Sequence, residues 1–353
     1  MPIIPTYLMS LEQRMQLIQE QEYAYMTSEL WAPAVYRARP SQSRVELIQW
    51  FLSTATMTDE DEGGNVAFDD MAAINTSITN RTAGRGLELK LEQLEDIDGG
   101  GAQMAAQWVR EESQLAAYWP QLKTADLMNT GASLSTATAT YDGLALFHTA
   151  HYVNPVEKGS LSVPSGYATT YRNLHTSANA LPIDDSVSLE VALQNLGKFR
   201  SYVSTIPTSN GLYPRHLAPV AWFVPPALGP RVKVLTGADF IAAAAGSSGT
   251  SGGTLDIKGL LSWLGMGMPY VCPELSAAFG GSDTSYYVLC APRGARSVLG
   301  PIVYIPREPF GIIYHGPMTS AQLAVKRKFQ WIQTGRYGIG PGHPFELHKV
   351  LAA

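Results

Sequence analysis

Residues 141–155 read YDGLALFHTAHYVNP and carry two histidines three positions apart, His148 and His151, shortly after Asp142. On a helix, side chains at positions i and i+3 share a face, so this spacing is one that zinc ligands use. The stretch has no glutamate at the position where an HExxH motif places its general base. It is therefore a weak match to a metalloenzyme motif.

Turn residues bound the stretch on both sides, because Asp142-Gly143 stands near its start and Asn154-Pro155 at its end. These residues disfavour a helix. We instead expect a loop in which Tyr141, Phe147 and Tyr152 pack together, while the two histidines form hydrogen bonds with backbone groups.

Amphipathic helices are predicted on either side of this loop. The glycines at 99–101 break the chain, and residues 102–130 then carry apolar side chains at helical spacing. Residues 185–203 show the same pattern, with Asp185 or Ser186 as the expected N-cap.

The N-terminal part combines a helix with a long hairpin. A helix is predicted from an N-cap at Ser10 to Leu30, and residues 31–43 read as an extended connector. Residues 45–86 place two strand-like arms around a Gly-Gly turn, which predicts a β-hairpin. An isolated two-stranded hairpin is marginally stable, so this one must rest on another part of the molecule.

Four acidic residues occupy the expected tip of the hairpin. They read as a solvated turn, as ligands of a hard cation, or as an ionic contact with a basic patch on another copy of the chain. The acidic residues and that basic patch, taken together as candidate contacts between subunits, are Asp59, Glu60, Asp61, Glu62, Lys326, Arg327 and Lys328.

Composition and charge point to contacts between copies. The chain has 353 residues, which is long for a single core, so two or more lobes are expected. Charged residues make up 16%, a low share that suits either a protein with much surface hidden against other chains or a large fold with uncharged polar loops.

The charge is unevenly distributed along the chain. Residues 1–150 hold nine Lys and Arg against 20 Asp and Glu, and residues 151–353 hold 16 Lys and Arg against 10 Asp and Glu. Such opposite halves suit head-to-tail contact, and the net charge of −5 argues against a free nucleic-acid binder.

Other motifs give no support to an enzyme. The two cysteines, Cys272 and Cys290, form no CxxC pair and are expected to be buried free thiols. The G-x-S-x-G match at 249–253 lies in a Gly/Ser run, and the glycines at 338–342 have no helix after them. We therefore predict no catalytic, cofactor or metal site. Without a signal peptide or an apolar run of ~20 residues, we expect synthesis in a cytosol.

Strands are predicted in the C-terminal half at 216–226, 268–272, 286–291, 302–305 and 321–333. Three stretches there carry a family resemblance: AWFVPPALGPRVKVL (221–235), GLLSWLGMGMPYVCPEL (259–275) and KRKFQWIQTGRYGIGPGHPF (326–345). In this order they resemble the HK97-like major capsid proteins of tailed bacteriophages, over essentially the whole chain. The stretch 141–155 looks like the YDGxxLFxxxH stretch of Mu-like major head subunits.

The resemblance implies an α+β, HK97-like capsid fold with an N-terminal arm, an extended β-hairpin loop (E-loop), a peripheral domain with a long spine helix, and an axial domain. The implied bounds are 1–44 for the arm, 45–86 for the E-loop, 87–210 for the first part of the peripheral domain with spine helix 102–130, 211–296 for the axial domain, and 297–353 for the return to the peripheral domain and the C-terminus.

The resemblance also implies a structural role and no enzymatic one. It implies a major capsid protein that self-assembles as hexamers and pentamers into an icosahedral shell around packaged double-stranded DNA. Such a protein is part of the virion and assembles in the host bacterial cytoplasm. Separate scaffolding, portal and decoration proteins are the expected partners, contact with DNA is non-specific and electrostatic, and no membrane or cofactor takes part.

Two alternatives remain at this stage. An encapsulin-like nanocompartment shell protein would share the fold and enclose enzymes instead of a genome. A cytosolic metal-dependent hydrolase would use Asp142, His148 and His151. Some relatives also begin with a scaffolding segment that is later removed, whereas only a short stretch precedes the first helix predicted here, so we expect scaffolding to be a separate protein.

Some relatives join their subunits by a Lys–Asn isopeptide bond. No lysine lies between Arg44 and Arg85, so we predict that the E-loop forms no such crosslink. Denaturing electrophoresis of mature particles should show the monomer band alone. A covalent ladder would contradict this prediction.

Overall fold

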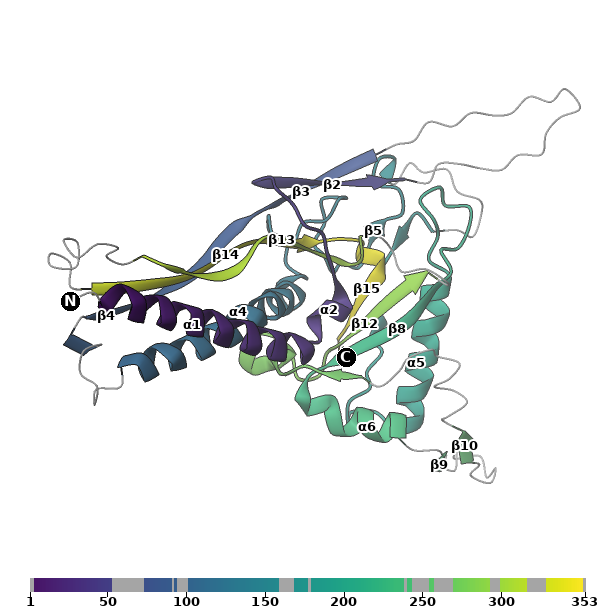
Figure 1. Cartoon of the computed structure of the whole chain (residues 1–353). Coiled ribbons are helices and arrows are strands. Elements are labelled where there is room, and N and C mark those ends of the chain that lie inside the picture. Colours follow the sequence, from purple (N-terminus) through teal and green to yellow (C-terminus); the bar gives the residue numbers. More distant parts are fainter. Residues whose placement is uncertain are drawn as a thin grey trace, which may run out of the picture.

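The protein, described here by a computed structural model, is built from two lobes on separate sheets (Figure 1). The structure describes residues 3–52, 73–90, 92–93, 101–158, 168–176, 179–237, 240–242, 254–256, 269–292, 299–315 and 328–351. Within these residues, no helix has both the length and the hydropathy of a transmembrane span.

The first lobe is a four-stranded sheet with two long helices along one face. Its strand order is β1-β13-β14-β4, with β1 parallel to β13 and the other pairs antiparallel. The apolar cluster under the helices includes Val109 of α4 and Trp331 of β14, which are both buried. The elements are α1 (Ile3–Ser28), α4 (Gly101–Thr130), β1 (Tyr36–Ala38), β4 (Arg81–Lys90), β13 (Ile302–Tyr314) and β14 (Lys328–Pro341).

The second lobe is a five-stranded sheet of order β11-β8-β12-β15-β7, packed against two shorter helices. Its core includes Phe199 of α5, Trp222 of β8 and Val232 of α6, all fully buried. The elements are β7 (Leu174–His175), α5 (Leu189–Ser204), β8 (Leu217–Val224), α6 (Gly229–Gly237), β11 (Tyr270–Val271), β12 (Tyr286–Pro292) and β15 (Leu347–Val350).

Short elements connect and flank the two lobes. They are α2 (Ala32–Val35), β5 (His151–Tyr152), β6 (Thr170–Tyr171), β9 (Phe240–Ala242), β10 (Thr254–Asp256) and the single-turn helices η4 (Pro226–Leu228), η5 (Pro273–Leu275), η6 (Ala277–Phe279) and η7 (Pro344–Glu346). The pairs β5–β6 and β9–β10 are small antiparallel ladders.

The predicted hairpin arms are present as β2 (Val45–Phe51) and β3 (Ala73–Thr79), which pair antiparallel along their whole length. The pairing ends at Thr79, short of the predicted residue 86. Asn80 turns the chain there, because its backbone N–H donates to the Arg44 carbonyl (2.9 Å) and its side-chain amide to the Ser43 carbonyl (2.7 Å). The chain then enters the first lobe as β4, whose Leu89 is buried under the helices.

Two predicted helix starts were wrong. Helix α1 begins at Ile3, so Ser10 lies inside it and does not cap it. Helix α5 has its N-cap at Ser188, whose Oγ accepts a hydrogen bond from the Val191 N–H (3.2 Å). Asp185 and Ser186 instead belong to a preceding turn.

Strand β14 continues well past the predicted end at residue 333. Gly335 lies inside it, and a Cβ there would come within 2.7 Å of the Phe310 ring. Gly340 also lies inside it, and a Cβ there would come within 2.8 Å of the Ile78 side chain. A glycine-rich run that reads as a loop in the sequence is therefore a strand over which large side chains pack. Residues 321–327 of the predicted strand lie outside the described residues.

The buried carboxylate of Glu274 joins three separate segments. Its Oε2 accepts a hydrogen bond from Trp31 Nε1 (3.1 Å), and its Oε1 accepts hydrogen bonds from Gln121 Nε2 (2.6 Å) and the Tyr118 hydroxyl. Burial, and then the hydrogen bond with Glu274, raise the pKa of Tyr118 above its usual value. Donors next to α2 and in α4 thus share one acceptor, which η5 supplies.

Replacing Glu274 with Ala should lower the free energy of unfolding by about 3 kcal/mol, because three donors lose a charged acceptor in a buried site. The matched control is Glu308→Ala, which removes an exposed partner of Arg336 and should cost about 0.5 kcal/mol. Urea denaturation of the unassembled chain measures both. Equal losses for the two variants would contradict the role given to Glu274.

Candidate functional site

The hairpin β2–β3 rests on the first lobe through one buried apolar cluster. Ile48, Trp50 and Ile78 of the hairpin meet Val303 and Ile305 of β13. The opposite face of β2 carries apolar side chains that are exposed in this chain, since 43% of Val45 and 58% of Leu47 is accessible. The root of the hairpin is thus fixed to the first lobe, while the side chains on the opposite face of β2 stay uncovered.

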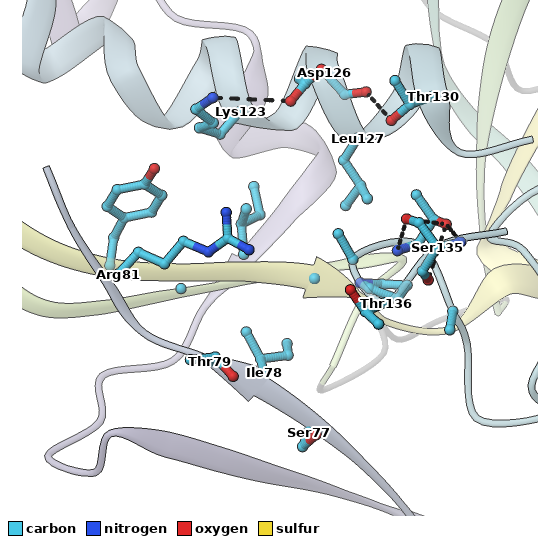
Figure 2. A pocket seen from close by; sticks show the side chains of 18 residues that line it. Ser77, Ile78, Thr79, Arg81, Lys123, Asp126, Leu127, Thr130, Ser135 and Thr136 are labelled. Atoms are coloured by element: carbon cyan, nitrogen blue, oxygen red, sulfur yellow. Dashed lines mark hydrogen bonds and ion pairs between the residues drawn. The ribbon is translucent and has the colours of Figure 1, made fainter. Parts of the chain in front are cut away.

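A cavity of about 320 Å³ opens beside this root, between α4, β3, the end of β14 and the loop at 135–139 (Figure 2). Lys123 Nζ lies 4.0 Å from Asp126 Oδ2, and the Thr130 hydroxyl donates to the Asp126 carbonyl (2.7 Å). The Arg81 side chain extends into the space below α4. The cavity is therefore lined by polar and charged groups of both signs.

The cavity does not have the parts of an acyl- or phosphoryl-transfer site. Among the described residues that line it, none is histidine or cysteine, and Asp126 is the single carboxylate. The hydroxyls of Ser135 and Thr138 are engaged with each other and with nearby backbone groups. Nucleophilic catalysis needs a base within hydrogen-bond reach of a hydroxyl, and this arrangement provides none.

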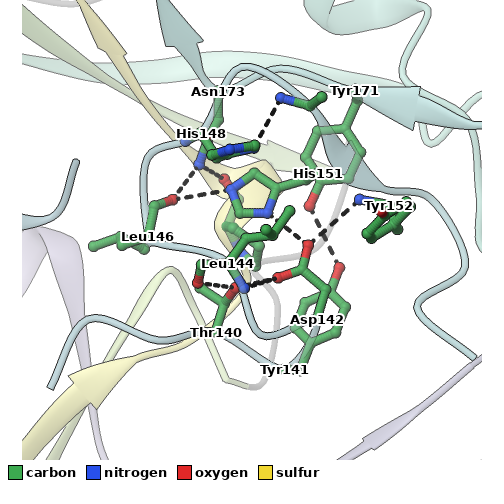
Figure 3. A network of polar contacts seen from close by, with 12 residues as sticks. Thr140, Tyr141, Asp142, Leu144, Leu146, His148, His151, Tyr152, Tyr171 and Asn173 are labelled. Atoms are coloured by element: carbon green, nitrogen blue, oxygen red, sulfur yellow. Dashed lines mark hydrogen bonds and ion pairs between the residues drawn. The ribbon is translucent and has the colours of Figure 1, made fainter. Parts of the chain in front are cut away.

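A buried pair of Asp142 and His151 lies at the centre of the stretch 141–155 (Figure 3). Asp142 Oδ2 is 2.7 Å from His151 Nδ1, and both side chains are fully buried. Burial raises the pKa of Asp142, but the hydrogen bond and charge of His151 and the hydrogen bonds from Thr140 and Leu144 outweigh burial, so the pKa lies below its usual value. His151 Nε2 lies 3.3 Å from the Leu146 carbonyl, so both ring nitrogens face oxygen acceptors.

His148 has a different role, at the edge of the same network (Figure 3). Its Nδ1 accepts a hydrogen bond from the Ala150 N–H (3.1 Å), and its own backbone N–H donates to Asn173 Oδ1 (2.8 Å). The Asn173 amide donates to the carbonyls of Leu146 (2.7 Å) and Pro344 (2.8 Å). The predicted backbone contacts of the two histidines are confirmed, and the loop is fastened to the segment that precedes β15.

The geometry gives no support to the hydrolase alternative. His151 uses both nitrogens inside the loop, and Asp142 Oδ1 accepts hydrogen bonds from the Thr140 hydroxyl (2.5 Å) and the Leu144 N–H (3.1 Å). In the part of the chain that the structure describes, no group of three or more His, Cys, Asp or Glu side chains is arranged to hold a metal ion. The hydrogen bonds of Asp142 and His151 fix a loop and leave neither ring nitrogen of His151 open to a metal ligand position.

A second buried network was not predicted from the sequence. His175 Nε2 lies 3.2 Å from His348 Nδ1, and His348 Nε2 lies 3.1 Å from the Phe345 carbonyl. Burial lowers the pKa of His175 to about 2 and that of His348 to about 3. Burial also lowers the pKa of Lys349 to about 8. These residues stand in two-residue and four-residue strands without an alternating pattern, so no sequence signal marks them as core.

The candidate inter-subunit residues stay a prediction. Asp59 to Glu62, with Lys326 and Arg327, lie outside the described residues. Lys328 begins β14, and its Nζ lies 2.6 Å from Glu88 Oε1 on the neighbouring strand β4. The two cysteines are buried free thiols, as predicted, and burial raises the pKa of both.

Comparison with known proteins gives a structural likeness. No protein-family model matches the sequence, and no curated protein matches it. Among solved structures, the capsid structure of cyanophage P-SCSP1u is 13% identical, with 90% of this chain and 86% of that chain covered and a TM-score of 0.51. The capsid of bacteriophage JBD30 is 10% identical, with 91% and 64% covered and a TM-score of 0.45. A virus-like particle from Pyrococcus furiosus is 8% identical, with 94% and 98% covered and a TM-score of 0.43.

The cyanophage likeness carries the fold assignment, since TM-scores below 0.5 are too low to argue from. The chain has the fold of this phage capsid protein, and the predicted α+β capsid fold class is confirmed. At 13% identity this likeness shows a shared fold. The chain spans less than two thirds of the JBD30 capsid chain, at 64% of its length.

Replacing Asp142 with Asn should destabilise the fold by about 3 kcal/mol at pH 7, because it removes the charge that faces His151 in a buried pair. The pKa of Asp142 is lowered in the folded state, so its contribution is fully present above the unfolded pKa of about 4 and is lost as pH falls through the folded pKa. The stability of the variant should therefore fall less between pH 5 and pH 3 than that of the unaltered chain.

Urea denaturation of the unassembled chain at each pH measures the effect. Asp126→Asn is the control, because that carboxylate is 63% exposed and lies 4.0 Å from its lysine partner. Parallel pH profiles for Asp142→Asn and the unaltered chain would show that the pair adds no pH-dependent stability.

Proposed function

We propose that this chain is a major capsid (head) protein, which assembles as hexamers and pentamers into an icosahedral shell around double-stranded DNA. The observation that carries the proposal is the capsid fold over nine tenths of the chain, with a hairpin fixed to the first lobe on one face and uncovered on the other. A marginal two-stranded hairpin with exposed Val45 and Leu47 suits a surface that a neighbour covers.

The domain assignment belongs to the same proposal. We assign α1 and the segment through residue 44 to the N-terminal arm, the hairpin and its tip (45–86) to the E-loop, and α4 to the spine helix. The first lobe corresponds to the peripheral domain (87–210 and 297–353). The second lobe, around β8, α6 and β12, corresponds to the axial domain (211–296).

Partners and location follow from assembly. A shell needs contacts on many sides, and the acidic N-terminal and basic C-terminal parts suit head-to-tail contact between copies. Separate scaffolding, portal and decoration proteins would act with the chain in the host bacterial cytoplasm, and the finished particle is the virion. DNA would meet the inner surface by non-specific electrostatic contact. The proposal includes no enzymatic activity, cofactor or membrane.

A nanocompartment shell of the encapsulin type is the second candidate, since such a protein would share the fold and enclose enzymes instead of a genome. The phage shell stands first, because the likeness with a TM-score of 0.51 is to a phage capsid. Particles that contain a bound enzyme, and in which no DNA is protected from added nuclease, would favour the nanocompartment over the phage shell.

Negative-stain microscopy of the overexpressed chain tests the proposal, and closed shells of uniform size are the expected result. One variant removes the four negative charges of the acidic tip (Asp59→Asn, Glu60→Gln, Asp61→Asn and Glu62→Gln). It should lower the yield of closed shells roughly tenfold, because the attraction between the acidic tip of one copy and basic residues of another is lost. The melting temperature of the unassembled chain should stay unchanged. Asp126→Asn is again the control and should leave the yield unaltered.

Either of two results would count against the proposal. The chain could stay monomeric under all conditions that favour assembly. The neutralised tip could also give the same yield and stability of particles as the unaltered chain, which would remove the ionic role of the tip.

A further inference from the structure

A second cavity, of about 200 Å³, interrupts the packing of α4 on β14. Alternate side chains of a strand share a face, and those of β14 from residue 329 onward turn toward α4. On this face Phe329, Trp331 and Tyr337 are large and buried, but Gln333 and Gly335 stand between them. The cavity lies at this gap, and Gln333 is part of its lining.

The walls of the cavity are apolar and held in place from behind. Phe310 of β13 packs over Gly335, and its carbonyl accepts a hydrogen bond from Gln19 Nε2 of α1 (2.9 Å). Trp119 of α4 meets Tyr337 edge to face, with ring centroids 6.4 Å apart. The smaller apolar residues of the lining are Ala83, Leu115 and Ala116. The cavity is therefore formed before any ligand enters it.

A buried amide without partners lies in this lining. Gln333 is 2% exposed, and neither its Oε1 nor its Nε2 has a hydrogen-bond partner among the described residues. Trp119 Nε1 is buried and has none there either. Buried polar groups are hydrogen-bonded in the great majority of cases, so an occupant of the cavity is expected to supply the missing partners. Because an amide holds its donor and acceptor in one plane, the matching occupant has an acceptor and a donor side by side on one edge.

The charges at the rim select a neutral occupant. Arg85 Nη1 lies 3.1 Å from Glu112 Oε1, and both residues line the cavity. No other residue in the described part of the lining is charged. Leu115 is 38% exposed, so the lining reaches the surface and a ligand can enter. The two charges satisfy each other, which leaves hydrogen bonds and apolar contact to bind the ligand.

A purine base has the size and the edge that this cavity requires. A cavity of roughly 150 Å³ holds benzene, so one of this size admits a ring with a second ring fused to it. A glutamine side chain pairs with adenine through two hydrogen bonds, in which Oε1 accepts from the N6 amino group and Nε2 donates to N7. Bases outside a duplex also pack against aromatic side chains, which Phe310 and Trp119 supply here.

We infer that the cavity binds a single adenine base, with its N6/N7 edge hydrogen-bonded to Gln333 and its ring against Phe310 and Trp119. A free adenosine and an unstacked base of a single-stranded nucleic acid present the same edge, so the same site would take either. The inference goes beyond the shell function and does not depend on it.

Equilibrium dialysis of labelled adenosine against the full-length, unassembled chain tests the inference. Gln333→Leu keeps most of the side-chain volume and removes both polar atoms, so it should weaken adenosine binding roughly tenfold or more. The matched control is Gln330→Leu on the same strand. Gln330 is exposed, donates to Glu88 Oε2 (2.8 Å) and does not line the cavity, so this variant should leave binding unaltered.

A second ligand shows whether Gln333 acts by direct contact. Purine riboside has the same rings as adenosine and lacks the N6 amino group. The unaltered chain should bind it roughly tenfold more weakly than adenosine, because one hydrogen bond to Gln333 is lost. Gln333→Leu should bind the two nucleosides alike. Should that variant fail to fold, Ala83→Phe, which fills the cavity with a ring, takes its place and should abolish adenosine binding.

Competition distinguishes the two sources of the base. Displacement of adenosine by single-stranded oligo(dA) assigns the site to nucleic acid, whereas binding of adenosine without such displacement assigns it to the free nucleoside, and both results support the inference. Three results would overturn it: no adenosine binding, binding that Gln333→Leu and Ala83→Phe leave unaltered, or equal binding of purine riboside and adenosine. Each of them leaves the shell function standing, because the chain is tested before assembly.

Discussion

The fold depends on one buried acceptor, the carboxylate of Glu274, where three segments far apart in the sequence meet. Trp31 at the end of the N-terminal helix, Tyr118 and Gln121 in the middle of α4, and η5 in the second lobe all converge there. A buried carboxylate is costly unless donors surround it, so these segments can share it only when each is in place. The junction thereby sets how α4 lies relative to both sheets.

With α4 fixed, glycines of β14 set the direction of the hairpin, because their lack of side chains leaves room for a hairpin residue. Ile78 occupies the space above Gly338 and Gly340 of β14, and the carbonyls at Ser43 and Arg44 hold the turn at Asn80. The hairpin is thus rigid at its root, which suits an element that acts at a distance from its own core. The loop 141–155 joins the same cluster, since Tyr141 packs against Trp50. The contacts that fold the first lobe therefore also set the direction of the hairpin.

Local pattern predicted α4 almost to the residue, because glycines bound a regular apolar spacing at both ends. It missed the length of β14, because the reason that Gly335 sits in a strand is Phe310, which comes from another part of the chain. The sequence drew attention to Asp142 and His151 but could not show that they bind each other instead of a ligand. Glu274 has no local signal at all, since its partners lie up to 243 positions away. Long-range contacts, which a pattern over a few residues cannot encode, account for each miss.

The position of β15 has a consequence for synthesis. This four-residue strand lies between β12 and β7, antiparallel to the first and parallel to the second, and all of its residues are buried. The sheet of the second lobe thus stays in two pieces until residues 347–350 leave the ribosome. Translation at about 5–20 residues per second makes that delay many seconds for a chain of this length. Until β15 fills this gap, β12 and β7 keep unpaired edges, and an unpaired strand edge is a template for pairing with another chain.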